Sequence, residues 1–262
     1  MADYLMRDGA PFGDDVWEKI DDMVVTVVKK NLVGRRVVDL VGPLGWGVEQ
    51  APLYGFASDG GAAVAESGGY LSLQELSADF LLRAKHLATA DQTPFGLDLG
   101  AVAIAATELA RKEDSLIIGG LLESVPKGNH LPLGDWDTLG GPFKAVSGAL
   151  AHLRSTGFDA PYALVMTPGT YARLASLMQH GRRELELVSR LVDDHLYQAT
   201  GLEALEGKVL VLSSSGWNVD LVLGQDVATA YLGNEALDHA FRILETLALR
   251  VKRPGAACLL EA

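Results

Sequence analysis

The apolar residues near the start of the chain follow the period of an amphipathic helix. The stripe is formed by Trp17, Ile20, Val24, Val27, Val28 and Leu32, and charged residues fill most of the remaining positions. Asp14 or Asp15 stands where a capping residue is expected, and Asp15 has capping-box spacing from Glu18. The pattern predicts a helix over 14–32 that ends at Gly34.

A strand over 36–41 leads into the glycine-rich turn Gly42–Gly47, "GPLGWG". A P-loop would end in Gly-Lys-Ser/Thr, and a dinucleotide fingerprint would open a helix at its last glycines. Here "VEQAPLYGF" follows, which contains a proline and has no helical period. We therefore interpret the turn as a connection between the strand and the next segment, not as a phosphate site.

Residues 48–82 are rich in glycine and small side chains, with short extended runs and no helical period. This pattern predicts a long projecting hairpin whose tip lies near 59–61. A two-stranded hairpin is marginally stable alone in water, so we predict that it lies against a neighbouring surface.

The remaining pattern alternates helices and strands, which indicates an α+β chain with one discontinuous body and one long arm. A helix over 97–118 is capped by Asp98 and ends at Gly119-Gly120. The other predicted helices are 142–155, 168–179 and 184–199, and the predicted strands are 162–167, 208–213, 219–223 and 244–253.

Composition narrows the function. The 22 Lys and Arg residues against 34 Asp and Glu give a net charge of −12, which argues against nucleic acid as a ligand. The hydrophobic fraction of 48% fits either a well-filled core or surface covered by other copies of the chain. There is no signal-peptide pattern and no apolar run near the roughly 18 residues of a membrane span, so we predict a soluble cytoplasmic protein.

No motif indicates an enzyme or a cofactor. Cys258 is the single cysteine, so the sequence has no disulfide framework and no cysteine-based zinc site. Asp193-Asp194-His195 is the nearest approach to a metal cluster, but it lacks a second histidine at ligand spacing. Paired carboxylates at Glu113-Asp114 and at Asp135/Asp137 are explained more simply as charged helix ends and turn caps.

The order of these elements resembles the HK97 fold of viral capsids, and the residues resemble the encapsulin shell proteins of the linocin type. The resemblance extends over essentially the full chain. Its carrying segments are 17–48, "DFLL" (79–82), "ARKEDSLIIGG" (110–120), "PLGDW" (132–136), "GPFKAV" (141–146), "PYALVMTPGTYARL" (161–174), "LVLGQD" (221–226) and "AYLGNEALDHAFRILETLALRVKRPGA" (230–256).

The resemblance implies an icosahedral shell in the cytosol, built from many copies of this chain. It implies a P-domain with the N-terminal helix and spine helix over 1–46, 84–124 and 225–262, an extended E-loop arm over 47–83, and an α/β A-domain over 125–224. The arm would lie across a neighbouring subunit.

The resemblance also implies two sites. A cargo protein would dock through a C-terminal targeting peptide beside the N-terminal helix, on the lumenal face of the shell. The matching positions are Ile20, Val24, Val28, Leu32, Arg35, Asp39 and, more weakly, Tyr231. A loop at Gln179, His180, Gly181, Arg182 and Arg183 would line a five-fold pore with positive charge.

The identity of the cargo is the least determined part of this prediction. Lys85 stands where flavin-binding members have a tryptophan, so we expect no flavin. The segments "GPLGWGV", "PLGDW", "AYLG" and "FRILE" are most similar to those of members with ferritin-like, iron-oxidising cargo. A dye-decolourising peroxidase is the main alternative cargo. A phage or prophage capsid protein is another alternative, although the segment 1–13 is shorter than the scaffolding or cleaved segment we would expect there. A free-standing enzyme with an unrecognised site is the last.

Overall fold

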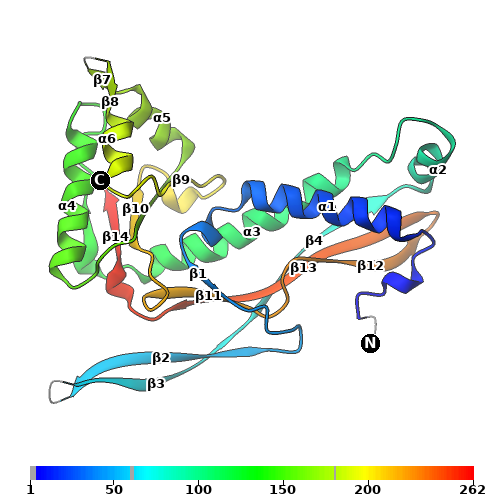
Figure 1. The fold of residues 1–262 in the computed structure, drawn as a ribbon, viewed down its shortest axis with the longest axis horizontal. Coiled ribbons are helices and arrows are strands. Elements are labelled where there is room, and N and C mark those ends of the chain that lie inside the picture. The colour runs from blue at the N-terminus through cyan, green and yellow to red at the C-terminus, as the bar shows by residue number, and fades with distance from the viewer. Residues whose placement is uncertain (1–3, 60–61, 180) are drawn as a thin grey trace.

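One long helix and one long strand form the spine of the molecule, which we describe from a computed structural model covering residues 4–59, 62–179 and 181–262. The helix is α3 (Gly100–Ser124) and the strand is β13 (Asp238–Val251). The N-terminal helix α1 (Asp14–Asn31) packs along α3, as Figure 1 shows. The predicted helix over 14–32 is thereby confirmed.

The helix ends differ from their predictions. Gly13 is the N-cap of α1 without a side-chain cap, and Asp15 pairs with Lys19 at 3.5 Å instead of forming a capping box. The spine helix passes through Gly119 and Gly120 to Ser124, so the predicted stop there is wrong. A Cβ at Gly120 would lie 2.9 Å from Leu249 of β13. Packing of the helix against the sheet therefore explains this glycine, because the close approach stabilises the helix beyond its local propensity.

The spine strand belongs to a five-stranded sheet ordered β1-β11-β13-β12, with β4 also paired to β13. These strands are β1 (Asp39–Val41), β11 (Val219–Leu223), β12 (Ala228–Glu235) and β4 (Gln74–Leu82). The strand predicted over 36–41 is shorter than expected, because residues 34–36 form a 3-10 turn. The Asp114 carboxylate accepts the backbone N–H groups of Val33 and Gly34, which fixes that turn.

The arm is a hairpin of β2 (Gln50–Asp59) and β3 (Ala62–Ser72), which pair only with each other among the described residues. It leaves the body at the lower left of Figure 1. Residues 74–82, which the sequence pattern assigned to the hairpin, instead form β4 on the body sheet. The tip at 60–61 lies outside the described residues, and the domain boundaries stay predictions.

The glycine-rich turn lies where the arm begins. The N–H groups of Leu44 and Gly45 donate to the carbonyls of Leu223 and Gly224 at 3.0 and 2.8 Å. Gly42 has φ +128°, and a Cβ there would lie 2.4 Å from the carbonyl oxygen of Leu223. The turn is therefore a backbone junction between β1 and the arm.

The remaining residues form an α/β lobe on a second sheet, ordered β5-β14-β10-β6-β9. Its core includes Trp136, Leu153, Leu164, Met166, Leu174 and Val188, under three helices that cover one face of the sheet. The strands are β5 (His130–Pro132), β14 (Ala257–Glu261), β10 (Val209–Ser213), β6 (Tyr162–Met166) and β9 (Leu196–Gln198). The helices are α4 (Gly141–Ser155), α5 (Pro168–Ser176) and α6 (Glu184–Arg190).

Two helices in the structure depart from the sequence pattern. The predicted helix over 184–199 ends at Arg190, because residues 196–198 leave it to pair with β6. The short helix α2 (Ala84–Gln92) was not predicted, since it contains no buried residue and has little apolar pattern to reveal it. Among the described residues, no helix combines the length and apolar character that a membrane span requires.

Candidate functional site

A groove lies beside the C-terminal half of α1, where that helix meets β1 and the residues before β12. We call it the α1 groove. Its volume is about 300 Å³. Val25 and Leu40 are 42% and 47% exposed, although both are apolar. The lining residues are Val25, Val28, Lys29, Leu32, Arg35, Arg36, Leu40, Asp226 and Val227.

Three of the seven predicted docking residues line this groove: Val28, Leu32 and Arg35. Ile20 and Val24 are buried under α1 in the hydrophobic core. Asp39 is exposed next to Leu40 but does not line the groove. Tyr231 lies in an aromatic cluster with Phe12 and Phe241, and its hydroxyl bonds Asn234 and His239.

Sequence reasoning missed Val25, Leu40 and Val227 as lining residues. Val25 follows the buried Val24 directly, so it must leave the apolar stripe of the helix and face outward. That signal was present in the sequence. Leu40 comes from β1 and Val227 directly precedes β12, and only the folded chain brings them to the same groove as Val25.

The floor of the α1 groove is held by one arginine bound to three carboxylates. Arg35 donates to Glu113 Oε1 at 2.6 Å, Asp226 Oδ1 at 2.8 Å and Glu245 Oε2 at 2.8 Å. We call these four residues the Arg35 cluster. Glu113 and Glu245 are fully buried, whereas Asp226 reaches the groove. Glu113 and Asp114, interpreted above as a charged helix end, are therefore interior residues of α3.

Burial favours the protonated form of Glu245 in this cluster. Burial, and then the charge of Glu113, raises the pKa of Glu245 to about 9. Burial by itself would lower the pKa of Arg35, but its hydrogen bond with Glu113 and the charge of that carboxylate outweigh burial and raise it. Glu113 Oε2 and Glu245 Oε1 have no hydrogen-bond partner among the described residues. A proton kept on Glu245 removes the negative charge of that carboxyl group from the surroundings of Arg35.

Asp114 shows the same competition between burial and hydrogen bonding. Burial raises the pKa of Asp114 to about 6, although the N–H groups of Gly34 and Val33 oppose that rise. The turn that follows α1 therefore rests on buried carboxyl groups at Glu113 and Asp114.

Of the predicted pore residues, Gln179, Arg182 and Arg183 belong to two short paired strands, β7 (Met178–Gln179) and β8 (Arg182–Arg183). Gly181 has φ +77°, the left-handed region that a tight turn uses. Arg182 and Arg183 are exposed, and neither makes an ion pair within the described part of the chain. His180 lies outside the described residues.

Comparison with known proteins decides the family. The family described as encapsulating protein for peroxidase (linocin M18) matches residues 2–248. The chain belongs to the encapsulin family. The encapsulin shell protein EncA of Myxococcus xanthus is 34% identical over 100% of this chain and 97% of its own length. A type 1 encapsulin shell protein of Mycobacterium tuberculosis is 28% identical over 93% of both chains.

Solved structures show the fold of this encapsulin. A virus-like particle from Pyrococcus furiosus matches with a TM-score of 0.80 at 22% identity, over 94% of this chain and 99% of its own. Mycobacterium phage Che8 matches with a TM-score of 0.60 at 15% identity, over 88% and 91%. The predicted α+β, HK97-like capsid fold is confirmed.

The encapsulin chain is therefore a shell subunit that forms a nanocompartment, a multi-subunit capsid-like particle. Its relatives are structural shell proteins, and the subunit itself is not an enzyme. This removes the free-standing enzyme from the alternatives. The likeness to phage capsids concerns the fold alone.

Proposed function

We propose that this encapsulin encloses a ferritin-like, iron-oxidising protein for iron storage in the cytoplasm. The cargo is held by its C-terminal targeting peptide in the α1 groove, on the lumenal face of the shell. The observation that carries the docking site is the uncovered apolar pair Val25 and Leu40, which line one groove from α1 and from β1. The iron-storage cargo rests on the resemblance of "GPLGWGV", "PLGDW", "AYLG" and "FRILE" to members with such cargo.

The groove has the chemistry for a short extended peptide. Val25, Leu40 and Val227 offer apolar contacts that two or three peptide side chains can cover. Lys29 and Arg36 stand at the rim, where they can bind carbonyl oxygens or a carboxylate. Because Arg35 is already neutralised by its carboxylates, the floor accepts apolar side chains without leaving a buried charge unpaired.

Leu40→Asp and Val25→Asp test the docking site. Covering one Leu or Val contributes about 1.5–3 kcal/mol, so we expect each variant to retain at least about ten-fold less cargo per particle. The measurement is quantitative mass spectrometry of proteins that co-purify with intact shells. The matched control is Lys85→Asp on α2, which changes charge away from the groove and should retain cargo normally.

The same preparation tests the cargo. Ferritin-like protein with bound iron supports iron storage, whereas a haem peroxidase supports the second candidate, which the description of the matching family favours. Normal cargo retention in both groove variants, with intact particles, would contradict the docking site whichever cargo is found.

We also propose that the β7–β8 hairpin lines a five-fold pore and gives it positive charge. Arg182 and Arg183 are exposed within one turn, well inside a Debye length of about 8–10 Å from each other. In Arg182→Glu/Arg183→Glu shells we expect iodide to quench a fluorescent cargo at least about ten-fold more slowly. Arg154→Glu reverses the charge of an exposed residue at the end of α4 and is the control. An unchanged quenching rate in the double variant would contradict the proposed pore.

A further inference from the structure

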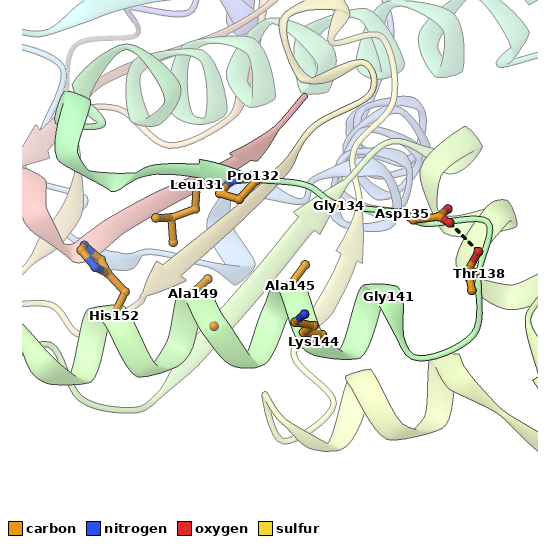
Figure 2. A pocket seen from close by; sticks show the side chains of 11 residues that line it. Leu131, Pro132, Gly134, Asp135, Thr138, Gly141, Lys144, Ala145, Ala149 and His152 are labelled. Atoms are coloured by element: carbon orange, nitrogen blue, oxygen red, sulfur yellow. Dashed lines mark hydrogen bonds between the residues drawn. The ribbon is translucent and has the colours of Figure 1, made fainter.

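A larger hollow lies on the α/β lobe, far from the α1 groove in the fold. It has a volume of about 670 Å³ and lies between α4 and the segment 131–138, which comprises the end of β5 and the turn after it (Figure 2). We call it the α4 groove. In Figure 2, Ala145 and Ala149 face the hollow from the helix, with Leu131 and Pro132 across from them.

The small residues of α4 fall into two kinds. Gly141 is required by its own chain, because a Cβ there would lie 1.7 Å from the carbonyl oxygen of Asp135. Gly148 is not required in this way, because a Cβ there would meet no described residue within 4 Å and the glycine is exposed. A glycine inside a helix is destabilising relative to alanine. The subunit alone therefore gives no reason for Gly148, whereas close approach of another backbone does.

The rim of the α4 groove is already fixed in the single chain. Asp135 accepts hydrogen bonds from the Thr138 hydroxyl and from the N–H of Asp137. At the other end, His152 Nε2 lies 3.0 Å from Asn129 Oδ1, and the Asn129 amide donates to the carbonyls of Gly255 and Ala257. A partner that enters the groove therefore meets a preformed surface.

One charge in the α4 groove is unpaired. The Lys144 ammonium is exposed and makes no ion pair or hydrogen bond within the described part of the chain. Asp135, the carboxylate nearest to it in the lining, is engaged by the turn at Thr138. The groove thus offers an apolar floor and one free cation.

The opposite edge of the same sheet presents the complementary charge. The sheet runs from β5, beside the α4 groove, to β9. Directly before β9 is the turn Asp193–His195, which we call the acidic turn. Asp193 and Asp194 are exposed with φ of 49° and 65°, and backbone bonds from Asp194 to Ser189 and from His195 to Val192 hold the turn. The Asp193 carboxylate has no partner among the described residues.

We propose that the α4 groove of each subunit receives the acidic turn of a neighbouring subunit in the shell. The two surfaces lie at opposite edges of one rigid sheet, so each copy uses one edge to bind the next, which is the head-to-tail contact that closes a ring. Lys144 faces the Asp193 and Asp194 carboxylates across that contact, and Gly148 lets the turn approach the helix backbone. The contact rests on the chain being a shell subunit and is independent of the proposed cargo.

Lys144→Glu tests the charge pairing, because it places three carboxylates together. We expect the fraction of protein in particles, measured by sedimentation velocity, to fall at least about five-fold. Adding Asp193→Asn and Asp194→Asn restores assembly, since asparagine also tolerates positive φ and removes the repulsion. Adding Glu203→Gln to Lys144→Glu, a neutralisation outside the turn, does not restore it. Equal assembly of Lys144→Glu and wild type, or rescue by Glu203→Gln alone, overturns the proposal.

Gly148→Ala separates this contact from a role within the subunit. Alanine should raise the unfolding temperature of the subunit, because it favours the helix, yet lower the assembled fraction. A second measurement uses Ala145→Cys in the groove with His195→Cys on the acidic turn, linked by a short bismaleimide and analysed on denaturing gels. These positions leave the charged residues and Gly148 unchanged. We expect covalent dimers and higher multimers only when both cysteines are present, since the native Cys258 is buried. Assembled double-cysteine particles that give no multimers overturn the proposal.

Discussion

Replacing Tyr54 and Phe56 of the arm by serine is expected to abolish shell assembly while the subunit stays folded. The two side chains are 50% and 55% exposed and lie on one face of β2, because alternate residues of a strand share a face. Within the part of the chain that the structure describes, the arm pairs with no strand of the body, and Figure 1 shows it projecting away from both sheets. A hairpin of this kind needs another surface to lie against.

The expected size of the assembly defect follows from the apolar area that each arm covers and from the number of arms in the particle. Covering a Tyr or Phe contributes about 1.5–3 kcal/mol, and the loss recurs at every arm of the particle. We therefore expect the particle fraction to fall more than about ten-fold in sedimentation velocity, with an unchanged circular dichroism spectrum.

Val64→Ser is the matched control. Val64 pairs with Ala57, so it lies on the other face of the hairpin from Phe56, which pairs with Ala65. Assembly should persist in this variant. Intact particles of the Tyr54/Phe56 variant would contradict an arm that binds a neighbour through this face.

Arg35→Met is expected to lower the thermal stability of the shell more than any surface substitution. Removing the guanidinium leaves Glu113 and Glu245 buried without their cation, which costs roughly 3–5 kcal/mol. The Arg35→Lys control keeps the charge but not the three-way geometry, and should be intermediate. Glu113→Gln combined with Arg35→Met should recover part of the loss, measured by differential scanning calorimetry.

The same cluster predicts the direction of a pH dependence. Because the pKa of Glu245 in the folded chain is raised from its ordinary 4.5 to about 9, the folded state binds a proton that the unfolded chain releases. The contribution of Glu245 to stability is therefore fully present below pH 4.5 and decreases as the pH rises toward 9. Glu245→Gln should flatten this slope between pH 5 and pH 9, and an unchanged slope would show that other groups cause it.

Local pattern determined those elements whose identity depends on neighbours along the chain. The stripe from Trp17 to Leu32 predicts α1, and the apolar run 162–167 predicts β6, because periodicity reports which face is buried. The antiparallel pairing of residues 50–59 with 62–72 also follows from their short extended runs and small side chains. The resemblance carried by many short segments predicted the family and the fold.

The tertiary structure decided what depends on contacts between distant residues. The spine helix passes through Gly119-Gly120 because β13 packs there, and α6 ends early because residues 196–198 pair with β6. The docking residues predicted on the N-terminal helix were also separated by contacts between distant residues. Ile20 and Val24 face the core, whereas Val28 and Leu32 reach a groove whose other walls come from Leu40 and Val227.

The Arg35 cluster shows most clearly what local sequence patterns cannot predict. Arg35 and its partners Asp226 and Glu245 lie 191 and 210 residues apart, so no local period links them. Their charges look like ordinary surface charges in the sequence. In the folded chain, burial raises the pKa of Glu245, whereas the hydrogen bond and charge of Glu113 outweigh burial and raise the pKa of Arg35. Sequence by itself determined the family and most elements of this shell subunit. Only folding determined which faces remain open for other chains, because burial is a property of the whole chain.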